Sequence, residues 1–212
     1  VYHKPVIMIN YVSFAGLQNH LAYDSFDCGR AGTGYVNLYN GDVVIARPLT
    51  QCGGNRMPVS ITAYYGAQLF GVTARVGSHW RLSCDQCMTK SYINDELYFI
   101  WSKGDGSQHY FRKPNSSAAY YEDLSGLSLK LTDNGTYTEI EDKGGTVMRF
   151  ESPQDALDDT GRLLSITDSC GNTNTFQYGD WRLERITDGA GRVTQFIYTN
   201  NMLSGILAPG ET

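Results

Sequence analysis

Apolar residues recur with a period of 20 residues in the C-terminal part of the chain, from 161 to 210. Each of the two complete copies carries a leucine, an isoleucine three residues later, then Asp and Gly, and finally a Phe-x-Tyr pair, while the third copy carries only the leucine and the isoleucine. The equivalent positions are Leu163, Leu183 and Leu203; Ile166, Ile186 and Ile206; Asp168 and Asp188; Gly171 and Gly191; Phe176 and Phe196; Tyr178 and Tyr198. A fixed period of this kind indicates one supersecondary unit that is repeated along the chain.

Each copy predicts a strand, a tight turn and a second strand. Asp is favoured at the first position of a type I turn, and a Gly three residues later can supply the left-handed residue of a three-residue hairpin loop with a bulge. Phe176 and Tyr178 are two residues apart, so they share one face of a strand, and stacked units would align such aromatics in ladders. Leu183 and Ile186 are three residues apart, so a bulge or a strong twist is needed to bury both.

The same spacing continues upstream in weaker form. Ile140, Asp142, Gly145 and Phe150 match the repeat, and Trp101, Gly106 and Phe111 match it more loosely. We therefore expect an all-β chain of consecutive antiparallel hairpins that form one extended, curved sheet. The predicted hairpin region is 96–212, degenerate over 96–150 and regular over 161–210.

The first half of the chain has a different pattern. Residues 1–30 show no clear period and are interpreted as a lead-in or linker, and residues 31–95 as an N-terminal β segment that opens the repeat region. The dipeptide Asn40-Gly41 between two β-rich runs predicts a hairpin with a type I′ turn, in which both central residues have positive φ.

Composition agrees with β-structure and narrows the function. The 212 residues include 15 Tyr and 23 Gly, and a chain of 212 residues suffices for one domain or two. The net charge is −5 and the 17 basic residues form no basic run, so we expect no nucleic-acid partner. No run of 18 apolar residues is present, so we expect no membrane span.

The cysteines do not form a convincing metal or redox site. Cys84 and Cys87 have the spacing of half a zinc site, but a second cysteine pair or a histidine pair is missing, since the four histidines are scattered. Free, partly buried thiols are favoured; disulfides such as Cys28–Cys52 or Cys84–Cys87 are the alternative if the protein is secreted. The five cysteines are Cys28, Cys52, Cys84, Cys87 and Cys170.

The acidic residues are better explained by turns than by chemistry. Calcium needs about six oxygen ligands, whereas each repeat turn brings one Asp, and Asp155, Asp158 and Asp159 resemble a solvated acidic loop. No nucleophile elbow, zinc-helix motif or Gly-rich cofactor loop occurs. Cys84 with His79 is the remaining nucleophile–base combination. We therefore expect a non-catalytic chain without cofactor, metal or catalytic residues.

At these residues the chain resembles the RHS/YD-repeat family. The repeats carry GRLxxITDxxGNxxxFxY at 161–178 and RLxxITDxxGRxxxFxY at 182–198, although Tyr178 is followed by Gly179-Asp180 and Tyr198 by Thr199. The segment that opens the repeat region of large bacterial wall-associated members is similar to AGTGYVNLYNGDVV (31–44), GNRMPVSIT (54–62), HWRLS (79–83), DGSQHYF (105–111) and EDKGGTVMRFES (141–152). The resemblance covers roughly residues 28–210.

The resemblance implies a structural role. Family members are secreted or associated with the bacterial cell wall, and their hairpins build a shell that encloses or displays a C-terminal toxin or effector. The implied partners are the remainder of a parent chain, with further YD repeats and the effector. The incomplete third copy also leads us to expect either more chain or a partner at that sheet edge.

A second hypothesis is a surface adhesin that binds cell-surface glycans. It rests on the abundance of aromatic residues, including Trp80, Trp101 and Trp181, because aromatic rings can stack on sugars. The alternative explanation is that these rings belong to the core and to the ladders.

The turn hypothesis makes a direct prediction. Gly171→Val should lower the free energy of unfolding by roughly 1–3 kcal/mol, because a β-branched residue resists the left-handed conformation. Thermal unfolding of the two proteins measures this difference. An unchanged melting temperature would show that Gly171 is not left-handed.

Overall fold

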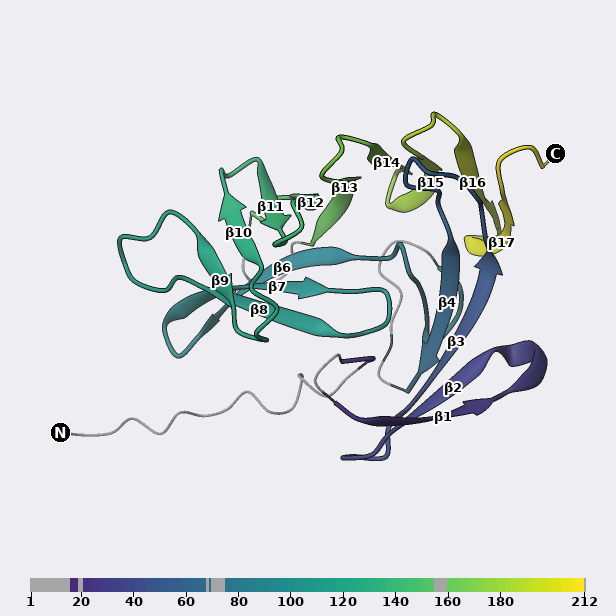
Figure 1. The fold of residues 1–212 in the computed structure, drawn as a ribbon, viewed down its shortest axis with the longest axis horizontal. Coiled ribbons are helices and arrows are strands. Elements are labelled where there is room, and N and C mark those ends of the chain that lie inside the picture. Colours follow the sequence, from purple (N-terminus) through teal and green to yellow (C-terminus); the bar gives the residue numbers. More distant parts are fainter. Residues whose placement is uncertain (1–15, 19–20, 68, 70–74, 155–159, 212) are drawn as a thin grey trace.

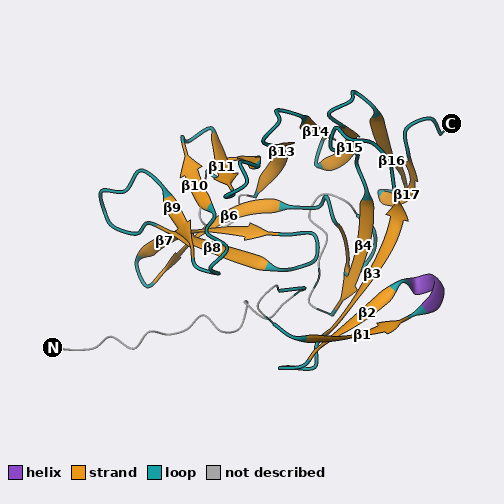
Figure 2. Cartoon of the chain, in the orientation of Figure 1, coloured by secondary structure: helices purple, strands orange, loops and turns teal. Residues whose placement is uncertain are grey.

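The fold consists of two antiparallel sheets (Figure 1). It is known from a computed structural model, which describes residues 16–18, 21–67, 69, 75–154 and 160–211. These residues form seventeen strands and one short 3-10 turn, and they contain no α-helix (Figure 2). The expected all-β class and the antiparallel pairing are confirmed.

The N-terminal sheet contains five strands that are paired in sequence order. Its first strand lies within the predicted lead-in, and its 3-10 turn η1 (Gly29–Ala31) connects the first two strands. The strands are β1 (Tyr23–Asp27), β2 (Thr33–Asn37), β3 (Val43–Thr50), β4 (Ile61–Gly66) and β5 (Trp80–Leu82).

The second sheet contains the other twelve strands, which the chain again pairs mostly with their sequence neighbours. Tight turns join most of them, as expected for consecutive hairpins. The strands are β6 (Cys87–Ile93), β7 (Glu96–Ser102), β8 (Gln108–Arg112), β9 (Tyr121–Asp123), β10 (Lys130–Asp133), β11 (Tyr137–Glu141), β12 (Val147–Glu151), β13 (Gly161–Thr167), β14 (Thr173–Gly179), β15 (Arg182–Thr187), β16 (Val193–Thr199) and β17 (Met202–Leu207).

This second sheet does not stay extended, which corrects the prediction. Strand β13 pairs with β12 along one edge, and along its other edge it pairs first with β6 and then with β14. Strands β6 to β13 thereby close into an eight-stranded barrel, and β14 to β17 leave it as an open sheet, here called the arm. Closure removes the free edges that an extended sheet would expose. It was not predictable from hairpin patterns, because it joins residues as distant in sequence as Met88 and Gly161.

One hydrophobic core connects the barrel, the arm and the N-terminal sheet. In Figure 1 the barrel strands lie on the left, the arm at the upper right and the N-terminal sheet below the arm. Fully buried side chains come from all three parts: Phe99, Phe111, Leu131, Ile140, Phe150 and Leu163 from the barrel, Leu183 and Ile186 from the arm, and Ile61 and Leu82 from the N-terminal sheet.

The hairpin predicted at Asn40-Gly41 is present, but its turn type differs. Strands β2 and β3 pair, and Asn37 N–H donates to the Asp42 carbonyl across a four-residue loop. Gly41 has φ +76°, while Asn40 is not among the left-handed residues, so the loop is not type I′. A two-residue loop with positive φ at both positions occurs instead at Asn200-Asn201.

Gly161 is the residue at which the barrel closes, and it leaves no room for a side chain. A Cβ at Gly161 would collide with the backbone carbonyl of Glu151 and would lie 3.4 Å from Pro153 Cδ. We predict that Gly161→Ala lowers the free energy of unfolding by about 1–3 kcal/mol, because the strand must shift away from its neighbour. Chemical denaturation measures the loss.

Gly53→Ala is the matched control, since a Cβ there meets no atom within 4 Å and the backbone is not left-handed. It should leave stability unchanged or slightly higher. Equal effects of the two substitutions would contradict the assignment of Gly161 to the closure.

Candidate functional site

The repeated turn has the same backbone geometry in each copy. Asp168 N–H donates to the Asn172 carbonyl at 3.0 Å, Gly171 N–H donates back to the Asp168 carbonyl at 3.0 Å, and Gly171 has φ +83°. The same pair of bonds and a left-handed Gly occur in the turns that begin at Asp142, Asp188 and Lys103. The predicted three-residue loop closed by a left-handed Gly is therefore confirmed, and it reaches back to the loosest copy. A Cβ at Gly171 would meet no atom within 4 Å, so the predicted cost of Gly171→Val is conformational.

The turn aspartates are occupied by backbone hydrogen bonds. Asp168 Oδ1 accepts from the N–H groups of Cys170 and Asn172, both at 2.9 Å, and Asp188 Oδ1 accepts in the same way from Ala190 and Arg192. Such bonds favour the charged carboxylate. The Asn172 side chain, followed by these backbone donors, lowers the pKa of Asp168. Burial opposes the effect at Asp188, but the N–H and the guanidinium of Arg192 outweigh it and lower the pKa.

A bulge in each copy lets both apolar residues face the core. Gln177 pairs with Arg185 and Tyr178 with Leu183, so the register skips Glu184. Leu183 and Ile186 are consequently both buried, as the spacing predicted. The register shifts in the same way after Leu163 and after Leu203, where it skips Leu164 and Ser204.

A tyrosine hydroxyl bonds the second strand of each hairpin to the first. Tyr178 donates to the Leu163 carbonyl at 2.9 Å, and Tyr198 donates to the Leu183 carbonyl at 2.8 Å. Burial raises the pKa of both phenols well above the ordinary value. The hydroxyls therefore stay protonated and keep donating.

Arginines stack on these tyrosines and were not anticipated. The guanidinium of Arg162 lies 4.9 Å from the Tyr178 ring centroid, and that of Arg182 lies 5.1 Å from the Tyr198 ring. Arg162 also donates from Nε to Glu151 Oε2 at 2.7 Å. The signal was available, because both arginines directly precede the repeat leucine at the 20-residue period.

Sixteen of the repeat positions, those in 140–150 and in the two complete copies, separate into three groups. The turn residues are Asp142, Gly145, Asp168, Gly171, Asp188 and Gly191. The residues that line the core or pack against it are Ile140, Phe150, Leu163, Ile166, Phe176, Leu183, Ile186 and Phe196. Tyr178 and Tyr198 bond the two strands of their own hairpins to each other. These positions build a sheet and do not converge on a reaction centre.

The cysteine motif is buried at the start of the barrel strand β6. All five cysteines are free thiols, and Cys84 and Cys87 are buried. Burial raises the pKa of both thiols, which opposes the thiolate that a nucleophile or a zinc ligand must supply. Next to them lies a buried pair, with Arg81 Nε 3.9 Å from Asp85 Oδ2.

A second polar cluster surrounds His109 in the barrel. His109 Nδ1 lies 3.1 Å from Ser125 Oγ and 4.0 Å from Asp123 Oδ1, and the His109 ring lies 5.1 Å from that of Trp101. A catalytic triad needs the hydroxyl on one ring nitrogen and the carboxylate on the other. Here both approach the same nitrogen, so the cluster lacks the geometry of a relay.

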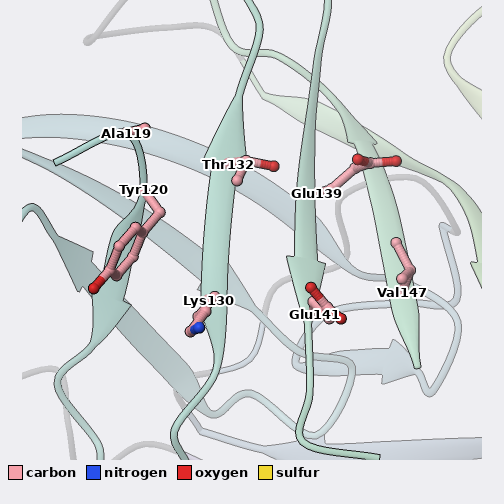
Figure 3. Close-up of a pocket in the computed structure, with 7 residues that line it drawn as sticks. All are labelled: Ala119, Tyr120, Lys130, Thr132, Glu139, Glu141 and Val147. Carbon is pink, nitrogen blue, oxygen red and sulfur yellow. The ribbon is translucent and has the colours of Figure 1, made fainter. Parts of the chain in front are cut away.

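The surface grooves carry compensated charges. A groove of about 270 Å³ lies on the outer face of β10 to β12. Figure 3 shows the residues that line it: Ala119, Tyr120, Lys130, Thr132, Glu139, Glu141 and Val147. Lys130 lies opposite Glu141 and Glu122 on neighbouring strands. Cross-strand pairs of opposite charge are ordinary sheet stabilisation.

No metal-ligand cluster of three or more His, Cys, Asp or Glu side chains occurs in the part of the chain that the structure describes. The predicted acidic loop with Asp155, Asp158 and Asp159 lies outside that part. Among the described residues, no helix has the length and apolar character required to cross a membrane.

No protein-family model matches the chain, and a search of curated proteins finds no significant match. Function is therefore inferred from the residues of this chain.

The turn aspartates predict a pH dependence of stability. The pKa values of Asp142, Asp168 and Asp188 are lowered in the folded state, so their stabilisation is present above the unfolded pKa of about 4 and is lost as the pH falls through the folded value. The urea concentration at the midpoint of unfolding should therefore decrease as the pH is lowered from about 5 to about 3.

The control is the triple variant in which Asn replaces Asp142, Asp168 and Asp188, measured over the same pH range. Asn can still accept the backbone hydrogen bonds but does not titrate, so its midpoint should change less over the same range. Parallel pH profiles for the two proteins would contradict the role of the turn carboxylates.

Proposed function

We propose that this chain is a non-catalytic structural segment of a secreted or bacterial cell-wall-associated RHS/YD-repeat protein. It forms a strip of a β-hairpin shell that encloses or displays a C-terminal toxin or effector. The observation that carries the proposal is the way the arm grows. Each 20-residue unit adds a hairpin with the same turn and the same bulge, and a tyrosine hydroxyl of that hairpin donates to the leucine carbonyl of its own first strand.

The distribution of polar groups supports this role. The repeat carboxylates accept backbone N–H groups within their own turns, and the repeat hydroxyls donate to backbone carbonyls. Groups used in this way extend and register a sheet. The buried thiols, whose pKa values are raised, also agree with a role in packing.

The barrel and the N-terminal sheet would anchor the start of the shell. Leu82 and Ile61 of the N-terminal sheet share a core with Leu183 and Ile186 of the arm. The loop between β3 and β4 also contacts the turn between β15 and β16, where Arg192 Nη1 donates to the Gly53 carbonyl at 2.8 Å. A hairpin by itself is marginally stable in water, so the first units of such a shell need this support.

The proposal predicts that the arm can be lengthened by repetition. We expect one or two further copies of residues 193–212, added after Thr212, to fold as additional hairpins. Each copy should raise the β signal in circular dichroism by a similar increment, because the new strands pair with β17 and then with one another.

The matched control carries the same added copies with Ser at the positions equivalent to Phe196 and Tyr198. These copies lack the core residue and the tyrosine bond, so they should add length without β signal. If both extended proteins gave the same β signal in circular dichroism, or if neither gave more signal than the original chain, the proposal that the arm grows by repetition would be wrong.

A glycan-binding role is the second candidate, and it rests on Trp181. Trp181 is 78% exposed, whereas Trp101 is buried and Trp80 is half-buried. The guanidinium of Arg162 lies 5.9 Å from the Trp181 ring. A glycan array tests this role: hits that disappear in Trp181→Ala would support an adhesin, and an array without hits would remove it.

A further inference from the structure

Exposed apolar side chains gather on the N-terminal sheet. It holds six of the eleven large exposed apolar residues found among the described residues, and they lie on β1, β3, β4 and the β2–β3 loop. They are Phe26, Leu38, Tyr39, Val43, Leu49 and Tyr65. An apolar surface of this kind, concentrated on one element, marks an interaction site more often than scattered exposed residues do.

The pairing register places part of this set on one face. Phe26 lies opposite Gly34, Gly34 opposite Ile45, Ile45 opposite Tyr65, and Tyr65 opposite Trp80, so one row crosses all five strands. Residues directly opposite one another share a face of a sheet. The Phe26 ring covers Gly34, where a side chain would collide with it, and the Tyr65 and Trp80 rings are 5.3 Å apart. The row is therefore a continuous apolar strip.

The same face already packs against the arm. Ala63 lies two residues from Tyr65 in β4, and Leu82 lies two residues from Trp80 in β5, so both are on the same face as the row. They are opposite each other and are buried in the common core. The face is thus covered at one end by the arm, while Phe26 and Tyr65 are exposed by 44% and 37%. Its exposed part is continuous with an interface that the protein itself uses.

The arm is also less completely covered at its last strand. Leu163 and Leu183 are fully buried, but the equivalent Leu203 in β17 is only half-buried. Leu203 N–H donates to the Arg75 carbonyl at 2.8 Å, which places β17 beside the segment that leads into β5. In the described residues, β17 pairs with β16 alone.

We propose that the exposed apolar strip and the outer edge of β17 together form a seat for one further β-hairpin of the same repeat type. This inference rests on the proposed function and adds to it the surface that receives the next unit. One strand of the hairpin pairs with β17, and its Phe and Leu or Ile side chains cover the row from Phe26 to Tyr65. A hairpin fits because the seat combines a strand edge, which among the described residues has no second partner strand, with an apolar face, the same combination that holds the hairpins of the arm.

The test uses the full chain extended after Thr212 by one copy of residues 193–207, which supplies one hairpin. Hydrogen exchange should show at least about tenfold slower exchange in β17, and also in β1 and β4, than in the original chain. The extended chain should also have a higher melting temperature than the original chain. In the extended chain, the double variant Phe26→Ser/Tyr65→Ser should lose the added protection in β1 and β4 and most of this rise in melting temperature. Tyr92→Ser, which removes an exposed aromatic from the barrel, should lose neither.

Val43→Lys provides a second variant on the same face, two residues from Ile45, and circular dichroism establishes that each variant is folded. If β17 is protected and the melting temperature rises equally in all variants, the apolar strip is not part of the seat. That result would contradict this inference but not the addition of hairpins to β17. Absence of protection in β17 itself would overturn the proposed function as well. Self-association of the original chain that depends on Phe26 and Tyr65 would show that a second copy occupies this face, and would also overturn the inference.

Discussion

The pairing of β13 is the constraint on which the rest of the structure depends. Its first residues, Gly161 and Arg162, pair with β6 and close the barrel, while Ser165 to Thr167 pair with β14 and begin the arm. The other edge of β13 is occupied by β12. One strand therefore holds three neighbours, and Gly161 permits this because its missing side chain leaves room for the carbonyl of Glu151. The Arg162–Glu151 ion pair reinforces the same junction.

From this junction the arm extends by simple means. The left-handed Gly and the capping Asp set each turn, the bulge brings leucine and isoleucine onto one face, and the tyrosine hydroxyl connects the two strands of each hairpin. Each device satisfies backbone groups or buries apolar area, and none of them needs a ligand. The N-terminal sheet supplies the second layer, since a single sheet cannot bury its own apolar face.

Much of the repeat could be predicted from its residues. The hairpins, the turn glycines, the bulge beside Leu183 and the buried positions all follow from short-range spacing, because hydrogen bonding in turns and the alternation of side chains are local properties. The stacking of Arg162 on Tyr178 was missed, although the arginine period was visible. The loop at Asn40-Gly41 was assigned the wrong turn type, because the preference of these two residues for a type I′ turn does not determine how long the loop is. In the structure the Asn37 carbonyl accepts a hydrogen bond from Gly41 N–H, and this bond closes a four-residue loop.

The sequence by itself determined that the chain is all-β, built from hairpins, and which side chains of each unit point to the core. The tertiary structure alone decided that eight strands close into a barrel, that the arm branches from β13, and that the N-terminal sheet covers the apolar face of the arm. The physical reason is the range of the interactions. Turn and pleat geometry act over a few residues, whereas the contacts of Gly161 with Met88 and of Arg192 with Gly53 join segments that only the folded chain brings together.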